Sequence, residues 1–476
     1  MKQKYLITGL VVAAFTGSLT LMTSCVDDLN MNAEIDESAY SGIYENNGYL
    51  RDGNSNLVSN VVELYKDTYT TSVKMGFSRV PGSNTSAQVA FDADYLTVYN
   101  EEHGTDFELY PERLVSFVND GKLTVDHPSK SAYTDVTIRA DETVVENKTY
   151  ILPVAITNTS SDITVKDEEA AHCIYLIKDM RKLDNLAFKG EGAVRAFVFF
   201  DGTNPLNALA FELENGKMLW DVVSPFAANT GWDPVAQRPY LKCNDYIQFL
   251  LDNNETFLQP LRKRGMKVVL SVVGGRDMTG VAQLSEQGAK DFARELAQYC
   301  YAYNLDGVCF DDEYTEAPDV NNPALANRSE EAAARLCYET KKAMPDKLVA
   351  VYVLGNMTYN LPKVDESPMS EWVDILFADY GLNAAAVIKK GVESINCAGQ
   401  SMEFEQGKGG NLNPVQIKDN NAGWFMGFSP KVGNFESVFN RLYGGVEELY
   451  GAKLKAPTVF YKDNDATPYQ YPDDLQ

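Results

Sequence analysis

The sequence contains very little histidine. Its 476 residues include only His103, His127 and His172, and all three precede residue 190. Ser-His-Asp triads use histidine as the base, and many zinc sites use it as a ligand. A histidine-based triad or a histidine-rich metal site is therefore excluded after residue 190. Proton chemistry there must use carboxylates and tyrosines, and we expect neither a metal ion nor an organic cofactor.

Clustered cysteines and positive charge are also scarce. The seven cysteines show no CxxC pair and no zinc spacing, and apart from the first they are scattered in apolar or helical contexts. They fit buried small residues better than a disulfide framework. Lys and Arg number 42 against 67 Asp and Glu, for a net charge of −25. Nucleic acids and anionic membrane surfaces are therefore poor partners, whereas a neutral polar ligand is compatible with this charge.

The first residues have the features of a targeting segment. Residues 1–24 combine a basic start with an apolar stretch that is interrupted by Thr, Gly and Ser, as in a signal peptide. Residues 22–25 resemble a bacterial lipobox, which implies lipidation at Cys25 and a lipid anchor. Asp27 and Asp28 follow, as in the export signal of surface lipoproteins from glycan-degrading Gram-negative bacteria. We expect an outer-membrane protein facing the cell surface; the alternative is an ordinary secretory signal.

Composition and periodicity divide the rest of the chain into four segments. Residues 25–48 are polar and predict a flexible tether. Residues 49–177 contain short β-branched and aromatic runs between turn residues, which predict an antiparallel β-sandwich. Residues 178–189 are charged, lack a clear period and predict a linker. Residues 190–476 alternate strand and helix patterns.

The last segment predicts an α/β fold, a (β/α)8 TIM barrel. A doubly wound sheet would show a glycine-rich phosphate turn after its first strand, and residues 200–205 do not form one. The predicted strands are 194–200, 218–226, 267–273, 307–311, 348–354, 375–379, 402–405 and 424–428. The main predicted helices are 246–264, 285–303, 329–343 and 435–450.

Three acids follow one another at the end of the fourth predicted strand, 305–313. Alternate side chains of a strand share a face, so Cys309, Asp311 and Glu313 point one way. Asp311 and Glu313 would lie about 6–7 Å apart along the strand. Active sites of TIM barrels lie at the carboxyl ends of the strands. The pattern therefore predicts an acidic active site, although a surface strand that ends in solvated acids gives the same pattern.

Residues 306–313 resemble the DGxDxDxE signature of family 18 glycoside hydrolases. The run LDGVCFDDEY, 305–314, is most similar to endo-β-N-acetylglucosaminidases of the endoglycosidase H and F type. Cys309 stands where many members have an inner Asp, a departure that bears on their proton relay but leaves Asp311 and Glu313 in place. Further similar stretches follow in the expected order: 220–223, 226–229, 240–242, 267–275 and 378–381.

The position of the two acids favours substrate assistance over a protein nucleophile. Asp311 and Glu313 lie on one side of one strand, so Asp311 is badly placed for attack from the opposite face of the sugar. In the mechanism that the resemblance implies, the 2-acetamido oxygen of the bound GlcNAc attacks and forms an oxazolinium ion. Glu313 would then be the general acid and base, and Asp311 would orient the acetamide. By resemblance, Tyr380 would donate a hydrogen bond to the acetamide oxygen, or else be a rim aromatic.

Four further residues are candidates for substrate binding. Trp424 would form an apolar floor under the GlcNAc ring, unless it belongs to the barrel core. Asn356 would hydrogen-bond the acetamide or a hydroxyl, or alternatively cap a loop. Gly274 and Gly275 would let the rim of the third strand approach the sugar closely.

The resemblance implies hydrolysis of the GlcNAc-β1,4-GlcNAc core of N-glycans, with high-mannose glycans favoured. Its partners would be N-linked glycoproteins, the membrane would be contacted only through the lipid, and a monomer is expected. The alternatives are a chitinase-like hydrolase and a non-catalytic glycan-binding lipoprotein. The sandwich resembles the domain that precedes the hydrolase unit in such surface lipoproteins, and we expect it to act as a spacer, with glycan contact as the alternative.

Overall fold

The structure is a computed structural model that describes residues 46–146, 148–160, 163–380 and 391–475. The predicted signal peptide, Cys25 and the tether up to residue 45 lie outside the described residues. The first strand, β1 (Asn47–Asp52), begins two residues before the predicted start of the sandwich. Among the helices that the structure describes, none combines the length and the apolar composition that crossing a bilayer requires.

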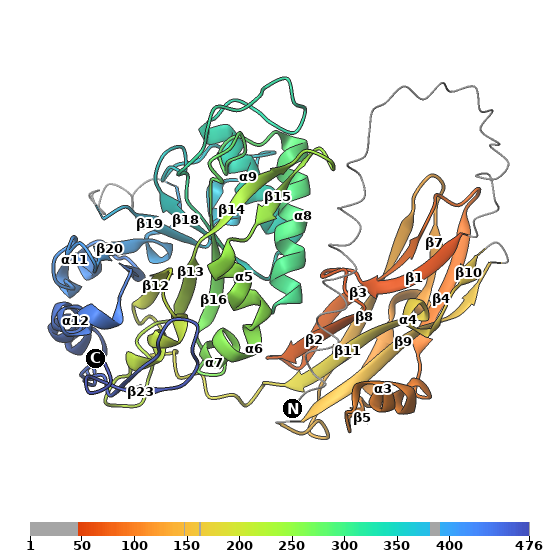
Figure 1. Ribbon diagram of the computed structural model, residues 1–476, viewed down its shortest axis with the longest axis horizontal. Helices are drawn as coiled ribbons and strands as arrows, with labels where there is room; N and C mark the ends of the chain where they lie inside the picture. Colours follow the sequence, from red (N-terminus) through yellow and green to blue (C-terminus); the bar gives the residue numbers. More distant parts are fainter. Residues whose placement is uncertain (1–45, 147, 161–162, 381–390, 476) are drawn as a thin grey trace, which may run out of the picture. The chain divides into compact units, whose positions relative to one another are not determined.

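The N-terminal strands form a β-sandwich, as predicted (Figure 1). One sheet has the order β10-β1-β3-β8-β6 and the other β2-β11-β9-β4-β7, with β5 beside β9. Most pairs are antiparallel, but β1 with β10, β2 with β11 and β5 with β9 are parallel. Burial alternates along β1 and β2, so every second side chain packs into a core shared by both sheets. The strands are β2 (Ser59–Leu64), β3 (Thr68–Phe77), β4 (Thr85–Phe91), β5 (Glu108–Leu109), β6 (Val115–Phe117), β7 (Lys122–Val125), β8 (Ser131–Arg139), β9 (Thr149–Thr159), β10 (Thr164–Val165) and β11 (His172–Asp179).

The remaining strands form the predicted (β/α)8 barrel. Eight parallel strands of the described residues follow the order β19-β18-β17-β16-β13-β12-β21-β20, and a parallel bridge between Leu376 and Cys397 closes the ring. The strands are β12 (Arg195–Asp201), β13 (Val222–Phe226), β16 (Lys267–Val273), β17 (Gly307–Phe310), β18 (Leu348–Val353), β19 (Ile375–Ala378), β20 (Ala398–Glu403) and β21 (Trp424–Phe428).

Two helices that follow barrel strands show the expected amphipathic pattern. Ser285 and Ser329 cap α8 (Glu286–Ala302) and α9 (Glu330–Ala343) by accepting a hydrogen bond from a backbone N–H in the first turn. In α8, Phe292, Leu296 and Cys300 are among the buried residues, which recur every four positions and face the sheet. The C-terminal α12 (Phe435–Tyr450) ends at Gly451 in the left-handed conformation.

Three elements differ from the sequence prediction. The predicted helix 246–264 is broken into α5 (Asp245–Asp252), α6 (Asn254–Phe257) and α7 (Gln259–Arg262), and the dihedral angles of Asn253 lie outside the helical region between the first two pieces. The seventh strand, β20, begins at Ala398, four residues before the predicted start at 402. Its six residues are all buried, and it pairs with β21. A hairpin of β14 (Ala228–Asp233) and β15 (Arg238–Lys242), which is not among the predicted strands, follows β13.

Candidate active site

The three consecutive acids extend β17 beyond its last regular residue. The Asp311 N–H donates to Val272 O at 3.2 Å, and the Gly274 N–H donates to Glu313 O at 2.9 Å. The segment therefore stays paired with β16 through Glu313. Asp311 is only 5% exposed, whereas the Glu313 side chain is partly exposed. The acids lie at the carboxyl end of a barrel strand, where active sites of this fold occur.

Asp311 occupies a site that disfavours its charge. Burial raises the pKa of its carboxyl to about 8, with further contributions from the negative charges of Glu313, Asp312 and Asp379. Its Oδ1 atom is buried and has no hydrogen-bond partner among the described residues. The Asp311 carboxyl therefore retains its proton near neutral pH.

Asp312 points the other way and is tied to the next strand of the barrel. Its Oδ2 accepts hydrogen bonds from the Asn356 backbone N–H at 2.7 Å, from Asn356 Nδ2 at 3.0 Å and from Arg328 Nε at 3.1 Å. Gly355 has φ +58, and a Cβ there would lie 2.5 Å from Oδ2 of Asp312. Asn356 therefore holds a loop, as in the second alternative considered from the sequence, and its amide is engaged by protein.

The two residues after β16 must be glycines because backbone carbonyl groups of neighbouring segments lie too close for a side chain. A Cβ on Gly274 would lie 2.3 Å from the carbonyl oxygen of Glu313, and one on Gly275 would lie 1.8 Å from that of Thr230. The sequence prediction attributed both glycines to close approach of a sugar. In the structure they let the Glu313 segment and β14 approach the end of β16.

Tyr380 lies two residues beyond β19, within the electrostatic reach of both acids. Burial raises the pKa of its phenol, and the charges of Asp379, Glu403, Glu313 and Asp311 raise it further. Its hydroxyl therefore remains a hydrogen-bond donor at neutral pH. The Lys408 ammonium lies 5.2 Å from the centre of its ring.

Trp424 does not lie with the acids but in the buried core of the barrel, which is the alternative to a floor of the sugar site. It is the first residue of β21 and pairs with Arg195 and Ala398, the first residues of their own strands. It therefore lies at the amino end of the barrel, 3% exposed, under the Arg195 guanidinium at 4.1 Å.

Aromatic residues that sequence reasoning missed lie at the carboxyl ends of strands. Phe226 and Phe428 are the last residues of β13 and β21 and are only partly buried. Their ring centroids are 5.2 Å apart, and both contact the buried Phe199 of β12. Their position at strand ends was the available signal, because the rim of the barrel is built from these ends.

Tyr314 and Arg276 were also missed. A hydrogen bond with the Glu313 carboxylate, together with burial, raises the pKa of the Tyr314 phenol. The Arg276 guanidinium lies 4.8 Å from the centre of the Tyr314 ring, and the Arg276 N–H donates to Tyr314 O at 2.7 Å. Both residues have positive φ, 58° for Tyr314 and 60° for Arg276, which is uncommon for residues other than glycine.

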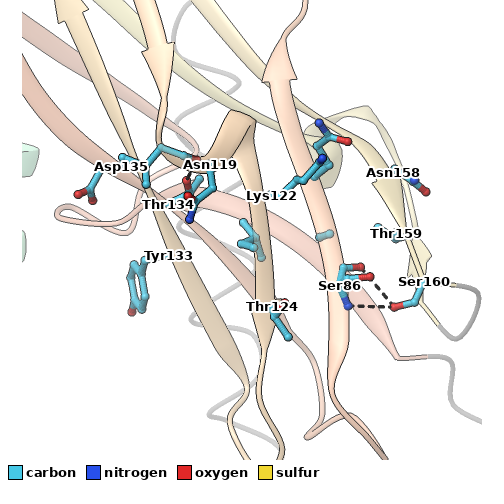
Figure 2. A pocket seen from close by; sticks show the side chains of 14 residues that line it. Ser86, Asn119, Lys122, Thr124, Tyr133, Thr134, Asp135, Asn158, Thr159 and Ser160 are labelled. Carbon is cyan, nitrogen blue, oxygen red and sulfur yellow. Dashed lines mark hydrogen bonds between the residues drawn. The ribbon is translucent and has the colours of Figure 1, made fainter.

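A hollow of about 720 Å³ lies on the sandwich and shares no residue with the predicted site (Figure 2). Its lining combines hydroxyl and amide side chains from four strands with one acid, Asp135, and one base, Lys122. It lacks a pair of neighbouring carboxyls, so it offers no general acid and base for glycoside hydrolysis. The spacer and glycan-contact roles of the sandwich both stay predictions.

The barrel and its acid pair define the class of the protein as a glycoside hydrolase. Comparison with known proteins agrees. The chain is 38% identical to endo-β-N-acetylglucosaminidase F1 of Elizabethkingia meningoseptica over 275 residues, which span 56% of this chain and 81% of that protein. It is 31% identical to an endo-β-N-acetylglucosaminidase of a Flavobacterium species, over 34% of this chain and 50% of that protein. A family model described as an N-terminal domain matches residues 44–163.

Two solved structures match both folded parts of the chain. They are EndoBT-3987 of Bacteroides thetaiotamicron with a Man5GlcNAc product, at 57% identity, and with a Man9GlcNAc2Asn substrate, at 52%. Each match covers 90% of this chain and 100% of the other, with a TM-score of 0.61. The chain belongs to the endo-β-N-acetylglucosaminidase family, and it is a glycosidase.

Proposed function

We infer that the chain hydrolyses the GlcNAc-β1,4-GlcNAc bond in the core of N-glycans and acts on high-mannose glycans. The observation that carries this inference is the acid pair Asp311 and Glu313 at the end of β17. The chain that carries it is 57% identical to EndoBT-3987, whose structure contains a Man5GlcNAc product. The products would be a free glycan ending in one GlcNAc and a protein that retains the other.

Glu313 is the general acid and base of the proposed reaction. Its side chain is partly exposed at the rim, where it can reach the bridging oxygen between the two sugars. It donates its proton to that oxygen as the bond to the anomeric carbon breaks. It then takes a proton from the water that opens the intermediate.

The nucleophile is the acetamide oxygen of the bound GlcNAc. A carboxylate nucleophile needs a partner about 5 Å away across the sugar, whereas Asp311 and Glu313 extend from the same strand. The acetamide oxygen attacks the anomeric carbon to form an oxazolinium ion. The Asp311 carboxylate accepts a hydrogen bond from the acetamide N–H, and its charge balances the ring that forms.

Tyr380 and the rim phenylalanines complete the proposed site. The hydroxyl of Tyr380 is held in its protonated form and donates to the acetamide oxygen. Phe226 and Phe428 present apolar surface at the ends of β13 and β21, and we assign to them, in place of Trp424, the role of the floor under a sugar ring. The proton held by Asp311 passes to Glu313 as the acetamide binds.

We also propose that the protein acts as a monomer at the cell surface. The lipobox at residues 22–25 would attach a lipid to Cys25, and the acids that follow favour export to the outer face. The polar residues 26–46 would then separate the anchor from the folded parts.

Incubation of the protein with one high-mannose glycoprotein and one complex-type glycoprotein, followed by mass spectrometry, tests the substrate. The inference expects the high-mannose protein to lose its glycan but keep one GlcNAc, a residual mass of about 203 Da per site by the chemistry of the cleaved bond. Release of the complete glycan, or cleavage of chitin oligosaccharides alone, would contradict the inference.

A further inference from the structure

A tyrosine–aspartate pair lies beside the buried carboxyl of Asp311. Tyr352 belongs to β18, the strand between β17 and β19, and it is 7% exposed. Its hydroxyl donates to Oδ1 of Asp379 at 2.5 Å. Asp379 follows β19 directly. A hydrogen bond from a neutral hydroxyl to a carboxylate is among the strong ones, and this one is short and largely shielded from water.

The register places this pair next to Asp311. Cys309 of β17 is paired with Ala350 of β18, so Tyr352 lies two residues further towards the rim, level with Asp311. The β18–β19 pairing aligns Tyr352 with Phe377, and Asp379 lies two residues further on the same face. Asp311 and Tyr352 therefore lie at one level on neighbouring strands, and Asp379 lies one same-face position closer to the rim on the third strand.

The layer beneath Asp311 provides no acid. Cys309 shares the face of Asp311 and is 1% exposed. Burial raises the pKa of its thiol well above the ordinary value, so the sulfur is neutral. The ionisable groups that act on Asp311 come from its own segment and from the end of β19: they are Glu313, Asp312 and Asp379.

The cations around Tyr352 and Asp379 already contact other side chains. The acids near Tyr352 and Tyr380 are Asp379, Asp311, Glu313 and Glu403. Among the nearby cations of the described residues, Lys408 faces the ring of Tyr380, Arg328 is paired with Asp312, and Arg276 stacks on Tyr314. The orientation of Asp379 therefore sets the charge that Asp311 meets from outside its own segment.

We propose that Tyr352 is a positioning residue whose hydroxyl fixes the Asp379 carboxylate beside Asp311. Tyr352 and Asp379 together take the place of the inner Asp that many family members have at the position of Cys309. The inference rests on the proposed roles of Asp311 and Glu313. Asp379 repels the charged form of Asp311 and so helps the Asp311–Glu313 pair to keep the proton that Glu313 must donate. Tyr352 does not touch the sugar in this scheme, because its hydroxyl is committed to Asp379.

Removal of the Tyr352 hydroxyl tests the proposal. In Tyr352→Phe, the Asp379 carboxylate loses the Tyr352 donor and turns away from Asp311. This movement lowers the repulsion on Asp311, so the Asp311–Glu313 pair loses its proton at lower pH. We expect kcat to fall about tenfold with KM nearly unchanged, and the alkaline limb of the kcat profile to move down by about half a pH unit.

Tyr301→Phe is the matched control. Tyr301 is 8% exposed, lies near the end of α8, and its hydroxyl donates to Asp346, which precedes β18 at the amino end of the barrel. The variant loses the same kind of hydrogen bond far from the rim. It should have a melting temperature similar to that of Tyr352→Phe, but wild-type kcat and an unshifted pH profile.

Asp379→Asn keeps an acceptor for Tyr352 and removes the charge. It should shift the alkaline limb in the same direction, and Tyr352→Phe should add little in the Asp379→Asn background. Equal effects of Tyr352→Phe and Tyr301→Phe, or full additivity of Tyr352→Phe and Asp379→Asn, would overturn the proposal. A wild-type protein that cleaves no glycan would instead contradict the proposed function, so the two failures are distinct.

Discussion

Asn356 donates two hydrogen bonds to one oxygen of Asp312, at 2.7 Å from its backbone N–H and at 3.0 Å from its side-chain amide. Asp312 lies between Asp311 and Glu313, so this contact fixes the backbone on which both proposed catalytic carboxyls are carried. The Arg328 guanidinium completes the arrangement at 2.9 Å. The acids are thereby held from β18 on one side and, through Gly274, from β16 on the other.

Asn356→Ala should therefore slow catalysis and weaken the fold modestly. The side-chain bond to a buried carboxylate is lost, which costs about 1–3 kcal/mol of unfolding free energy, while the backbone bond remains. We expect kcat to fall several-fold, measured by release of a high-mannose glycan. Asn253→Ala is the control, since Asn253 Nδ2 bonds only an exposed helix carbonyl. If the two variants retain equal kcat, the Asp312 contact does not position the acids.

Glu313→Gln should abolish hydrolysis of a natural N-glycan and leave glycan binding largely intact. Glutamine keeps the size of the side chain but cannot donate a proton to the leaving oxygen, and general acid catalysis contributes roughly 10²–10⁴-fold. The measurement is single-turnover hydrolysis beside binding by calorimetry. Turnover near that of the wild type would remove Glu313 from its proposed role.

Asp311→Asn should stabilise the fold, and more so as the pH rises. The pKa of Asp311 is about 8 in the folded protein against an ordinary value of 3.8. Between these values the unfolded chain has released the proton that the folded state retains. The wild type therefore loses up to about 1.4 kcal/mol of unfolding free energy per pH unit over that window.

Asparagine does not titrate, so the difference in unfolding free energy between Asp311→Asn and wild type should grow from pH 4 to pH 8 and level off above it. Chemical denaturation at several pH values measures this difference. A difference that is independent of pH would mean that Asp311 is ionised in the folded protein throughout.

Cys25→Ala should release the protein from membrane fractions without loss of hydrolysis. The proposed lipid on Cys25 is the anchor that the sequence indicates, and the barrel carries the proposed site. Fractionation of cells that express both forms, with activity assayed in each fraction, tests the anchor. Membrane retention of the variant would require a different attachment.

Much of the fold and the acid pair could be predicted from the sequence, because apolar periodicity and strand-end acids are local patterns. Asp311 and Glu313 can be recognised from one predicted strand alone. The predicted binding residues could not be placed in this way. Trp424 is a candidate for the apolar floor under the GlcNAc ring in the sequence, but its position at the start of β21 places it at the amino end of the barrel.

Contacts between distant segments could not be read from the sequence. The partner of Asn356 is a carboxyl 44 residues earlier, and the partner of Tyr352 lies 27 residues later. The reason for Gly274 is a carbonyl on the neighbouring strand. Each contact depends on the strand register of the closed barrel, because the register decides which residues become neighbours. No local sequence pattern encodes that register.

In the proposed reaction the nucleophile is the acetamide of the substrate and not Asp311. Asp311→Asn keeps the size of the side chain but loses the charge that balances the oxazolinium ion, so it should hydrolyse the intact glycan very slowly. A preformed glycan oxazoline already contains the high-energy ring and needs chiefly Glu313 for its addition to a GlcNAc acceptor.

The most direct measurement is therefore mass spectrometry of Asp311→Asn with an oxazoline donor and a GlcNAc-bearing acceptor, beside an attempt to trap an intermediate on the wild type. Substrate assistance predicts that the variant transfers the glycan and hydrolyses the product poorly, and that the wild type carries no sugar on its own residues. No transfer by the variant, together with a glycosyl ester on Asp311 of the wild type, would contradict it.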